Sequence, residues 1–262
     1  MSNINKTVRE LLYQNGIEYV SCLCAQELSI IQEHLYPKGI KSAFFWLIPY
    51  YTGKHENRNV SLYAVSRDYH AFSRVLEKRM KEMLKEQYPD EQFYFFCDSS
   101  PINEIAAAVK SGLGVLGKNR LLINEKYGSY VFIGSMLTSV VAQPEVIALE
   151  KHTCLGCGAC LKACDFLSDK REYCYSELNQ RKNVTQEELE IIKSKKVRWG
   201  CDECQEICPM NKNAAITPIP FFREETIQNI TPESIENMSK SQFRERAYSW
   251  RGKKVVLRNI EE

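Results

Sequence analysis

Cysteine is the residue type whose spacing most directly indicates chemistry in this sequence. Eight of its eleven cysteines lie between positions 154 and 208. The first group, with the spacing Cys-x2-Cys-x2-Cys-x3-Cys, consists of Cys154, Cys157, Cys160 and Cys164. The other four are Cys174, Cys201, Cys204 and Cys208. We see no secretory signal at the N-terminus, so we expect a reducing, cytoplasmic compartment in which thiolates bind metal rather than form disulfides.

The spacing of the first group is typical of chains that hold two [4Fe–4S] clusters, in which the fourth cysteine ligates the other cluster. Three thiolates at i, i+3 and i+6 of a curved loop can surround three irons of one cluster. The fourth thiolate comes from the following helical turn and points away from this cluster, toward the second one. We therefore predict that one cluster has the ligands Cys154, Cys157, Cys160 and Cys208. The second cluster then has the ligands Cys164, Cys174, Cys201 and Cys204. Two clusters of this kind indicate a function in redox chemistry.

Other interpretations of the cysteines are weaker. Zinc prefers two Cys-x2–4-Cys pairs, and a third cysteine at i+6 has no place in that template. Burial in the core without a metal is what we expect for Cys22, Cys24 and Cys97. Asp165 stands where the two-cluster pattern usually has proline, which puts the geometry near Cys164 outside that pattern.

The bulk composition bounds the class of protein. The chain has 262 residues, of which 44% are hydrophobic and 26% charged, and its net charge is +2. A balance so close to neutral gives no global electrostatic reason to bind nucleic acid or a membrane surface. The most apolar stretch, 43–48, is too short to span a bilayer, so we expect no membrane partner.

Hydrophobic periodicity in the first half predicts alternating helices and strands. Apolar residues at helical spacing indicate a helix over 72–84. Short apolar or aromatic runs predict buried strands at 43–48 and 92–97, and a further strand at 130–139. The pattern predicts a mixed fold of the α/β or α+β class.

Capping residues predict two further helices. One is expected to open at Pro101 with a serine cap before it, and to end at Gly112. The second, from 186 to about 195, would begin with the capping box of Thr185 and Glu188. We expect three parts: an α/β domain at 1–148, the cysteine domain at 149–215, and a basic tail at 216–262 packing on the core.

Several motifs resemble those of the epoxyqueuosine reductase family. The stronger ones lie at 97–104 (CDSSPINE), 111–119 (SGLGVLGKN), 127–134 (YGSYVFIG), 173–176 (YCYS) and 200–211 (GCDECQEICPMN). Weaker matches lie at 68–70 (DYH), 249–254 and 258–259. The matches run in the same order as in the family.

This resemblance implies a cobalamin cofactor in a nitroreductase-like α/β domain, followed by a ferredoxin-like domain with the two clusters. The clusters would deliver electrons one at a time to cobalt, from a donor such as ferredoxin or flavodoxin. The implied reaction reduces epoxyqueuosine in tRNA to queuosine. Full-length family members continue into helical repeats that help to hold tRNA, and we expect a short form without them here.

The resemblance also implies roles for residues outside the clusters. Asp98 corresponds to the family's acid, and a proton placed on the oxygen of an opening epoxide typically accelerates the reaction about 10²–10⁴-fold. The implied cofactor contacts are Asp98, Tyr69, Gly112, Gly114, Gly117, Lys118, Asn119 and Ser176. The plainer role for Asp98 is to cap the helix expected at Pro101, and both roles are compatible.

Two motifs in these segments have competing readings. Gly112, Gly114 and Gly117 spell the dinucleotide pattern G-x-G-x-x-G, but they follow an expected helix, whereas that pattern must follow a strand. A close approach to a planar ligand and an ordinary turn both stay open. His70 comes within one glycine of a motif that lends histidine to cobalt, and we expect it not to act in that way.

The leading hypothesis from the sequence is an oxidoreductase of the epoxyqueuosine reductase type. One alternative is a corrinoid-dependent or corrinoid-reducing protein that acts on a small molecule or on a partner protein. The other is a non-catalytic double-cluster module for electron transfer. Cobalamin binding and substrate turnover separate the three.

Overall fold

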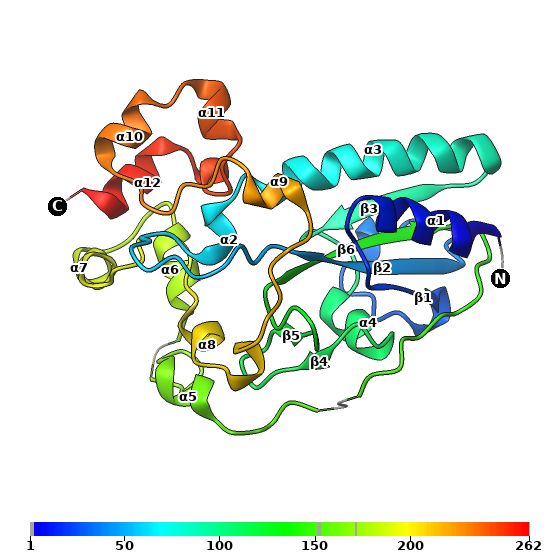
Figure 1. The fold of residues 1–262 in the computed structure, drawn as a ribbon, viewed down its shortest axis with the longest axis horizontal. Helices are drawn as coiled ribbons and strands as arrows, with labels where there is room; N and C mark the ends of the chain where they lie inside the picture. The colour runs from blue at the N-terminus through cyan, green and yellow to red at the C-terminus, as the bar shows by residue number, and fades with distance from the viewer. Residues whose placement is uncertain (1–2, 151–152, 171, 262) are drawn as a thin grey trace.

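The computed structural model describes residues 3–150, 153–170 and 172–261. The outermost positions of the expected domains, 1–2 and 262, lie outside this range. The fold is a mixed α/β structure in which one antiparallel sheet anchors helices on both of its faces (Figure 1). Helix α1 (Asn3–Gln14) and helix α12 (Lys253–Ile260) lie at opposite ends of the long axis.

The sheet has four strands in the order β1-β2-β6-β3. They span Val20–Cys24, Ser42–Pro49, Val131–Thr138 and Phe93–Cys97 for β1, β2, β6 and β3. All eight residues of β2 are buried, as expected for 43–48. The strand expected at 92–97 is present, but its complete burial was wrong: β3 is an edge strand, and Tyr94 is 37% exposed.

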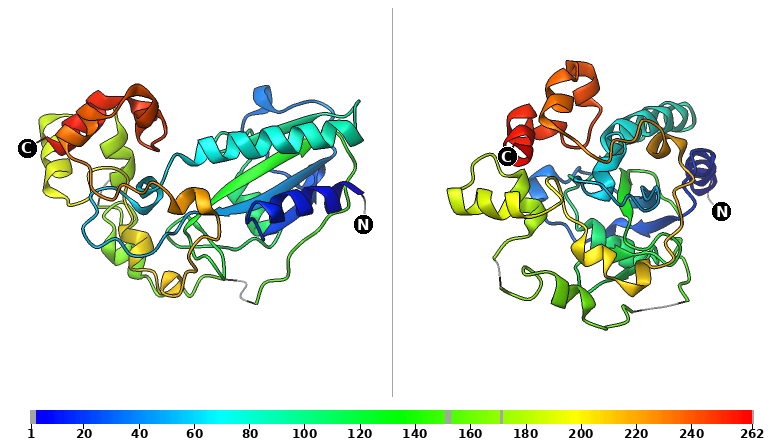
Figure 2. Two further views of the ribbon diagram at one scale, coloured as in Figure 1. Left: turned by 45° about the horizontal axis from the view of Figure 1, so that its top comes forward. Right: turned by 60° about the vertical axis from the view of Figure 1, so that its left-hand side comes forward.

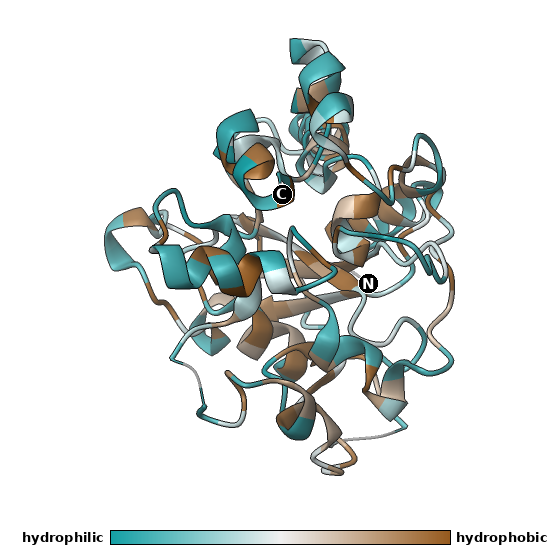
Figure 3. Cartoon of the chain, turned by 90° about the vertical axis from the view of Figure 1, so that its left-hand side faces the viewer, coloured by the Kyte–Doolittle hydropathy of each residue, from teal (hydrophilic) through white to brown (hydrophobic). Residues whose placement is uncertain are grey.

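Alternate residues of β2 face two different cores. Phe44, Trp46 and Ile48 pack under α1 and under α3 (Tyr69–Gln87), which covers the expected helix at 72–84. Phe45 and Leu47 pack on the opposite face beneath α4 (Glu104–Lys110). The result is a three-layer arrangement, with helices on both faces of the sheet (Figure 2). Figure 3 shows that the strands are mostly hydrophobic and that the outer helices carry many hydrophilic residues.

The start of α4 differs from the sequence expectation. The helix begins at Glu104, where the side chain of Asn103 caps it by accepting a hydrogen bond from the Ala106 amide at 3.0 Å. The carbonyl of Pro101 instead accepts from the amides of Ile31 and Gln32, so that segment pairs with a distant loop. Gly112, with a φ of 78°, does follow the end of the helix.

A two-stranded hairpin precedes the cysteine-bearing region, which consists of short helices. The hairpin pairs β4 (Val115–Leu116) with β5 (Leu122–Ile123). The helices α5, α6, α7 and α8 span Ala159–Ala163, Tyr175–Gln180, Gln186–Ser194 and Glu203–Glu206. Helix α7 opens with the expected capping box of Thr185 and Glu188. Helices α5 and α8 pack together.

The C-terminal segments build a second core beside the sheet. Helices α9, α10 and α11 span Pro220–Arg223, Pro232–Asn237 and Lys240–Arg244. Phe243, Tyr248 and Val256 pack with Val65 of α2 (Leu62–Val65) and with Trp199. Short 3-10 turns cover Ala25–Glu27, Glu33–Leu35, Pro209–Asn211 and Ser249–Arg251. No helix within the described ranges is long and apolar enough to cross a membrane.

Candidate functional site

Six of the eight predicted ligand cysteines lie in or next to short helices and turns, among which α5 and α8 pack together. Cys160 lies in α5, Cys204 lies in α8, and Cys174 is the residue that precedes α6. Cys164 ends α5, Cys201 precedes α8, and Cys208 opens the 3-10 turn that follows. Cys154 precedes α5 on the same loop as Cys157, whose side chain is exposed.

The electrostatic neighbours of the thiols overlap between the two predicted ligand sets. Burial raises the pKa of Cys204 to about 12, and the nearby thiols of Cys164, Cys174 and Cys160 raise it further, although Cys160 belongs to the first predicted set. Burial likewise raises the pKa of Cys201, which is also close to Cys174. Cys164, Cys174, Cys201 and Cys204 are the set predicted for the second cluster.

The remaining thiols form the other set. Burial raises the pKa of Cys160, and Cys208 and Cys154 contribute in the same direction. Cys208 and Cys154 are therefore neighbours of Cys160, and which cluster each thiol binds stays a prediction. Among the described residues, no three His, Cys, Asp or Glu side chains are close enough to bind a single metal ion. Eight thiolates are the number of ligands that two [4Fe–4S] clusters need, so the residue types fit the predicted clusters.

Asp98 lies directly after β3 and turns the chain sharply. Its φ of 68° is in the left-handed region, which aspartate tolerates better than most residues. The hydroxyl of Tyr69 donates a short hydrogen bond to its Oδ2. The carboxylate is otherwise exposed. Asn103 caps α4, so the helix-capping role considered for Asp98 is excluded.

Tyr69 is held in place from three directions. It is the first residue of α3, a helix that Asp68 caps by accepting a hydrogen bond from the His70 amide at 3.1 Å. Its ring stacks on Phe132 with the centroids 3.8 Å apart. Burial and then the charge of Asp98 raise the pKa of Tyr69, so the phenol remains a proton donor to the carboxylate.

His70 is engaged by the helix cap. Its Nδ1 lies 3.0 Å from Oδ1 of Asp68, and this hydrogen bond raises its pKa. The pairing gives the histidine a structural role at the start of α3.

A second tyrosine, Tyr63, is influenced by the charges of Asp202 and Asp98. Burial raises the pKa of Tyr63 in α2, and the charges of Asp202 and Asp98 add to the effect. Its hydroxyl accepts a hydrogen bond from Nε1 of Trp199 at 3.0 Å. Gln180 also contacts this hydroxyl, and Gln180 Nε2 donates to Oγ of Ser176 at 2.9 Å. Helix α6, which follows Cys174, is thereby tied to Tyr63.

The glycine-rich segment packs against its own chain. A Cβ at Gly112 would lie 1.9 Å from the carbonyl oxygen of Ile147, and one at Gly114 would lie 2.6 Å from that of Ile123. A Cβ at Gly117 would lie 2.2 Å from Oδ1 of Asn119. These contacts account for each glycine without a ligand. The segment also follows α4 rather than a strand, which confirms that it lacks the setting of a dinucleotide site.

The predicted cofactor contacts therefore divide between two places. Asp98 and Tyr69 lie together, with Ser176 linked to them through Gln180 and Tyr63. Lys118 lies instead at the first cysteine group, where its Nζ donates to the carbonyl of Gly156 at 3.3 Å. Asn119 is buried, and its Nδ2 has no hydrogen-bond partner within the described structure.

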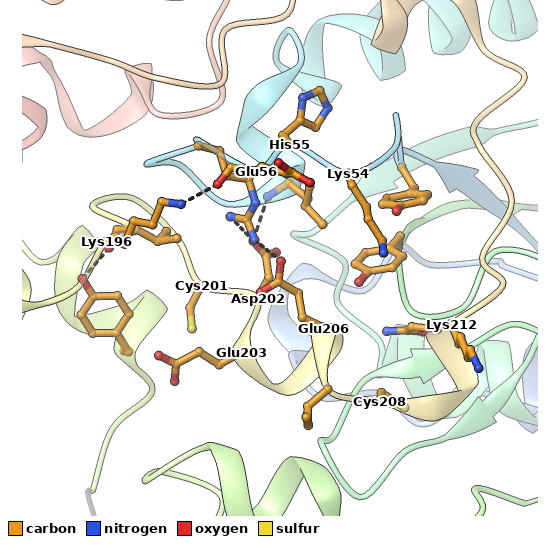
Figure 4. Close-up of a pocket in the computed structure, with 18 of the residues that line it drawn as sticks. Lys54, His55, Glu56, Lys196, Cys201, Asp202, Glu203, Glu206, Cys208 and Lys212 are labelled. Atoms are coloured by element: carbon orange, nitrogen blue, oxygen red, sulfur yellow. Dashed lines mark hydrogen bonds and ion pairs between the residues drawn. The ribbon is translucent and has the colours of Figure 1, made fainter.

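A cavity of about 670 Å³, which the sequence did not indicate, lies beside the cysteines (Figure 4). Cys201 and Cys208 line it together with Tyr51 and several lysines of the 54–58 and 195–212 segments. At its wall the buried Arg58 contacts Asp202 at 2.8 Å and Glu206 at 2.6 Å. Burial raises the pKa of Asp202 to about 6, against the opposing effect of Arg58.

Basic residues of the C-terminal tail are used within the fold. Arg246 donates to the carbonyl of Glu225 at 2.5 Å, and Lys253 donates to that of Met238 at 2.7 Å. Arg258 donates to the carbonyls of Arg181 and Lys182. These three cations hold loop carbonyls, a role that their clustering in the sequence did not reveal.

Comparison with known proteins relates this arrangement to one family. The epoxyqueuosine reductase of Listeria monocytogenes is 33% identical over 207 residues, which is 73% of this chain and 53% of the relative. The chain is homologous to the epoxyqueuosine reductases. It spans about half the length of the curated relatives it matches. No protein-family model matches the sequence.

Solved epoxyqueuosine reductases share the fold. One structure, with an epoxyqueuosine-modified tRNA-Tyr stem loop, superimposes with a TM-score of 0.79 at 23% identity, covering 98% of this chain and 80% of the other. The Bacillus subtilis reductase superimposes with a TM-score of 0.74 at 21% identity over the same shares, and its structure is described with a catalytic aspartate loop swung out of the active site.

Proposed function

We propose that this chain is an oxidoreductase that reduces epoxyqueuosine in tRNA to queuosine, with two [4Fe–4S] clusters and cobalamin as cofactors. The observation that carries the proposal is the exposed carboxylate of Asp98, held by the Tyr69 hydroxyl, in a chain that also carries eight cysteines with two-cluster spacing. An acid and a set of candidate metal-binding thiols in one chain match a reaction that needs both protons and electrons.

The crossed thiol sets support the cluster assignment. Cys154, Cys157, Cys160 and Cys208 would bind one cluster, and Cys164, Cys174, Cys201 and Cys204 the other. The clusters, when bound, supply one-electron transfer. Without metal, burial keeps the thiols of Cys201 and Cys204 protonated, so cluster binding would release those protons.

The positions of the two sets suggest an order for the electrons. The first set includes the exposed Cys157, whereas Cys174 of the second set leads directly into α6 and so toward Asp98. Electrons from a donor such as ferredoxin or flavodoxin would enter at the first cluster and leave from the second.

The support for cobalamin is the family relationship, together with two polar groups in separate places. Nδ2 of the buried Asn119 has no partner in the described structure, and the carboxylate of Asp98 is exposed while it accepts a hydrogen bond from Tyr69. Cobalamin, when bound, supplies a strongly reducing, nucleophilic metal centre. The glycines, Lys118, Asn119 and Ser176 remain predicted contacts. The pairing of His70 with Asp68 supports its expected absence from the cobalt coordination.

Asp98 would supply the proton that the epoxide oxygen takes up as its C–O bond breaks. Tyr69 would hold the carboxyl group in place at the end of β3.

By analogy with the family, residues 1–148 would form a nitroreductase-like domain and residues 149–215 a ferredoxin-like domain, with 216–262 as the tail. The tRNA partner is inferred from the structural neighbour described with a modified stem loop.

The test uses the full chain, reconstituted anaerobically with iron, sulfide and cobalamin, and assayed on an epoxyqueuosine stem-loop RNA. We expect about eight irons per chain, as two cubane clusters require, and turnover to queuosine. Asp98→Asn should retain both cofactors and lose turnover by about 10²-fold or more. Asp90→Asn, an exposed aspartate in the turn before β3, is the matched control.

The alternatives give different results in the same assay. Cobalamin that is bound and reduced without turnover of the stem loop or whole tRNA would favour a corrinoid-reducing protein. Clusters without any cobalamin binding would favour an electron-transfer module. Stoichiometric zinc in place of iron would exclude all three.

A further inference from the structure

The loop that carries the first cysteine group lies open to solvent. Leu155, Gly156 and Cys157 are all exposed, and Leu155 is 56% exposed. An exposed ligand thiol places the metal that it holds close to the surface of the protein. If the first cluster proposed above is bound here, a second protein can approach it at this loop.

The turn of the β4–β5 hairpin lies against the same loop. Its alternate residues Leu116, Lys118 and Arg120 are exposed, whereas the two residues between them are buried. The Nζ of Lys118 donates to the carbonyl of Gly156 at 3.3 Å, and the guanidinium of Arg120 lies 4.9 Å from the ring centre of Phe166. The hairpin turn therefore contacts the cysteine group on both sides of α5.

Two exposed leucines flank this contact. Leu116, two residues before Lys118, is 55% exposed, and Leu155 directly precedes Gly156. Apolar side chains surrounded by a polar rim are typical of the interface between two proteins. RNA phosphates are bound by cations and hydrogen-bond donors, so the leucines favour a protein as the partner.

The charge of the same surface is positive. Residues 115–123 and 153–166 carry Lys118, Arg120 and Lys162 against one carboxylate, Asp165, whereas the whole chain has 35 Lys and Arg against 33 Asp and Glu. Lys162 is exposed on α5, and Asp165 is partly buried and engaged in an interaction of its own. Charge of one sign attracts and orients a partner of the opposite sign, so the partner is expected to be acidic.

We propose that the surface formed by Leu116, Lys118, Arg120, Leu155 and Lys162 is the docking surface for an acidic flavodoxin that reduces the first cluster. The flavin ring has an apolar dimethylbenzene edge, which the two leucines would receive, while the cations face carboxylates around it. A small contact area is usual for transient electron-transfer complexes.

The electron balance of each encounter is simple. The flavin hydroquinone anion gives up one electron and becomes the neutral flavin radical, so no proton crosses the interface. The first cluster takes up that electron. Two encounters supply the two electrons that reduction of one epoxide consumes.

The first experiment measures binding without turnover. Full-length protein reconstituted with iron and sulfide is titrated calorimetrically with an oxidised, acidic flavodoxin at low salt. We expect a complex that weakens as salt is added, because salt screens surface charges. Lys162→Glu and Leu116→Ser should each weaken it by about fivefold, with the iron content unchanged.

Helix α3 supplies the matched controls, because it lies at the opposite edge of the molecule from α5 (Figure 1). Lys81 is exposed, and Val75 is 55% exposed, as Leu116 is. Lys81→Glu and Val75→Ser should bind flavodoxin as tightly as the wild type does. Equal losses of affinity in both pairs of variants, or no complex with the wild type, would overturn the proposal.

The second experiment follows reduction of the clusters by their visible absorbance. Reduced flavodoxin should act about fivefold more slowly on Lys162→Glu and Leu116→Ser than on the wild type. Dithionite, a small reductant that needs no docking surface, should act on all three at the same rate. Equal slowing with dithionite would trace the effect to damaged clusters and count against the docking surface.

Other occupants of this surface would give different results. RNA binding that is lost in Lys162→Glu while flavodoxin binding stays intact would make it an RNA surface and refute the proposal. A ferredoxin that binds here when flavodoxin does not would refute it as well.

Both experiments are independent of cobalamin and of substrate. A wild type that flavodoxin reduces but that never turns over epoxyqueuosine defeats the proposed function and leaves the docking surface standing. Turnover driven by dithionite in a protein that flavodoxin neither binds nor reduces defeats the docking surface alone.

Discussion

The hydroxyl of Tyr69 donates its hydrogen bond to the carboxylate of Asp98 across 29 positions of sequence. The contact joins the first residue of α3 to the first residue beyond β3. Neither residue needs the other for its own element, since Asp68 caps α3 and Asn103 caps α4. The pair therefore serves the carboxylate, which it orients at an open surface.

Removing the phenolic oxygen should weaken catalysis without harming the fold. Tyr69→Phe keeps the ring stacked on Phe132 and removes the hydrogen bond to Asp98. We expect turnover of the stem loop to fall by about tenfold, as for the loss of one hydrogen bond to a charged group. Thermal unfolding should change little. Tyr13→Phe, at an exposed position on α1, is the control. An unchanged rate would mean that Tyr69 does not orient the acid.

Loss of one cluster should spare the other. Cys157→Ala removes a ligand from the first set, and iron should fall from about eight to about four per chain. A cluster signal from the second set should remain in the electron paramagnetic resonance spectrum of the reduced protein. Cys22→Ala, in a buried thiol of β1, should retain all the iron. Complete loss of both clusters in Cys157→Ala would contradict two separate ligand sets.

The cap of α4 can be tested through stability. Asn103→Ala removes the acceptor for the Ala106 amide and should cost about 1 kcal/mol of unfolding free energy. Ser100→Ala should cost less, because Ser100 accepts only a long bond of 3.4 Å from Ile102. Urea unfolding of the two variants measures the difference. A larger loss of stability in Ser100→Ala than in Asn103→Ala would favour the helix start at Pro101 that the sequence predicted.

His70 should not coordinate the cobalt of bound cobalamin. His70→Ala breaks its contact with Asp68, which costs some helix stability, but the axial signature of bound cobalamin should not change. The electron paramagnetic resonance spectrum of the one-electron-reduced cofactor reports this directly. A nitrogen splitting that is present in the wild type and vanishes in His70→Ala would show that the assignment is wrong.

The raised pKa of Glu104 should make the unfolding free energy depend on pH. Its pKa is about 7 in the folded protein against 4.5 for an unperturbed carboxyl, so the folded state binds the proton more tightly. The contribution is complete below pH 4.5 and is lost as pH rises through 7. The wild type should therefore lose up to about 3 kcal/mol relative to Glu104→Gln between these limits. Urea unfolding at pH 5 and pH 8 measures it, and equal changes in both proteins would contradict a raised pKa.

Local patterns in the sequence were sufficient for several features. The cysteine spacing predicted two crossed ligand sets, and this assignment stays a prediction; the structure places Cys208 near Cys160 and Cys174 near Cys204. The strand at 43–48 was predicted from a continuous apolar run, and the helix at 72–84 from apolar residues at helical spacing. The capping box at Thr185 is also a purely local signal.

Other features depended on contacts between distant segments. Pro101 does not open a helix because its carbonyl pairs with Ile31 and Gln32, about 70 positions earlier. The closeness of Gly112 to Ile147, of Asp98 to Tyr69, and of Glu104 to Ser135 likewise arises only when the strands pair. Residue type and spacing determined which chemistry this chain can perform. The register of β3 on β6 and the burial that it creates decided where the protons lie, since the pKa of a carboxyl depends on neighbours that no local pattern specifies.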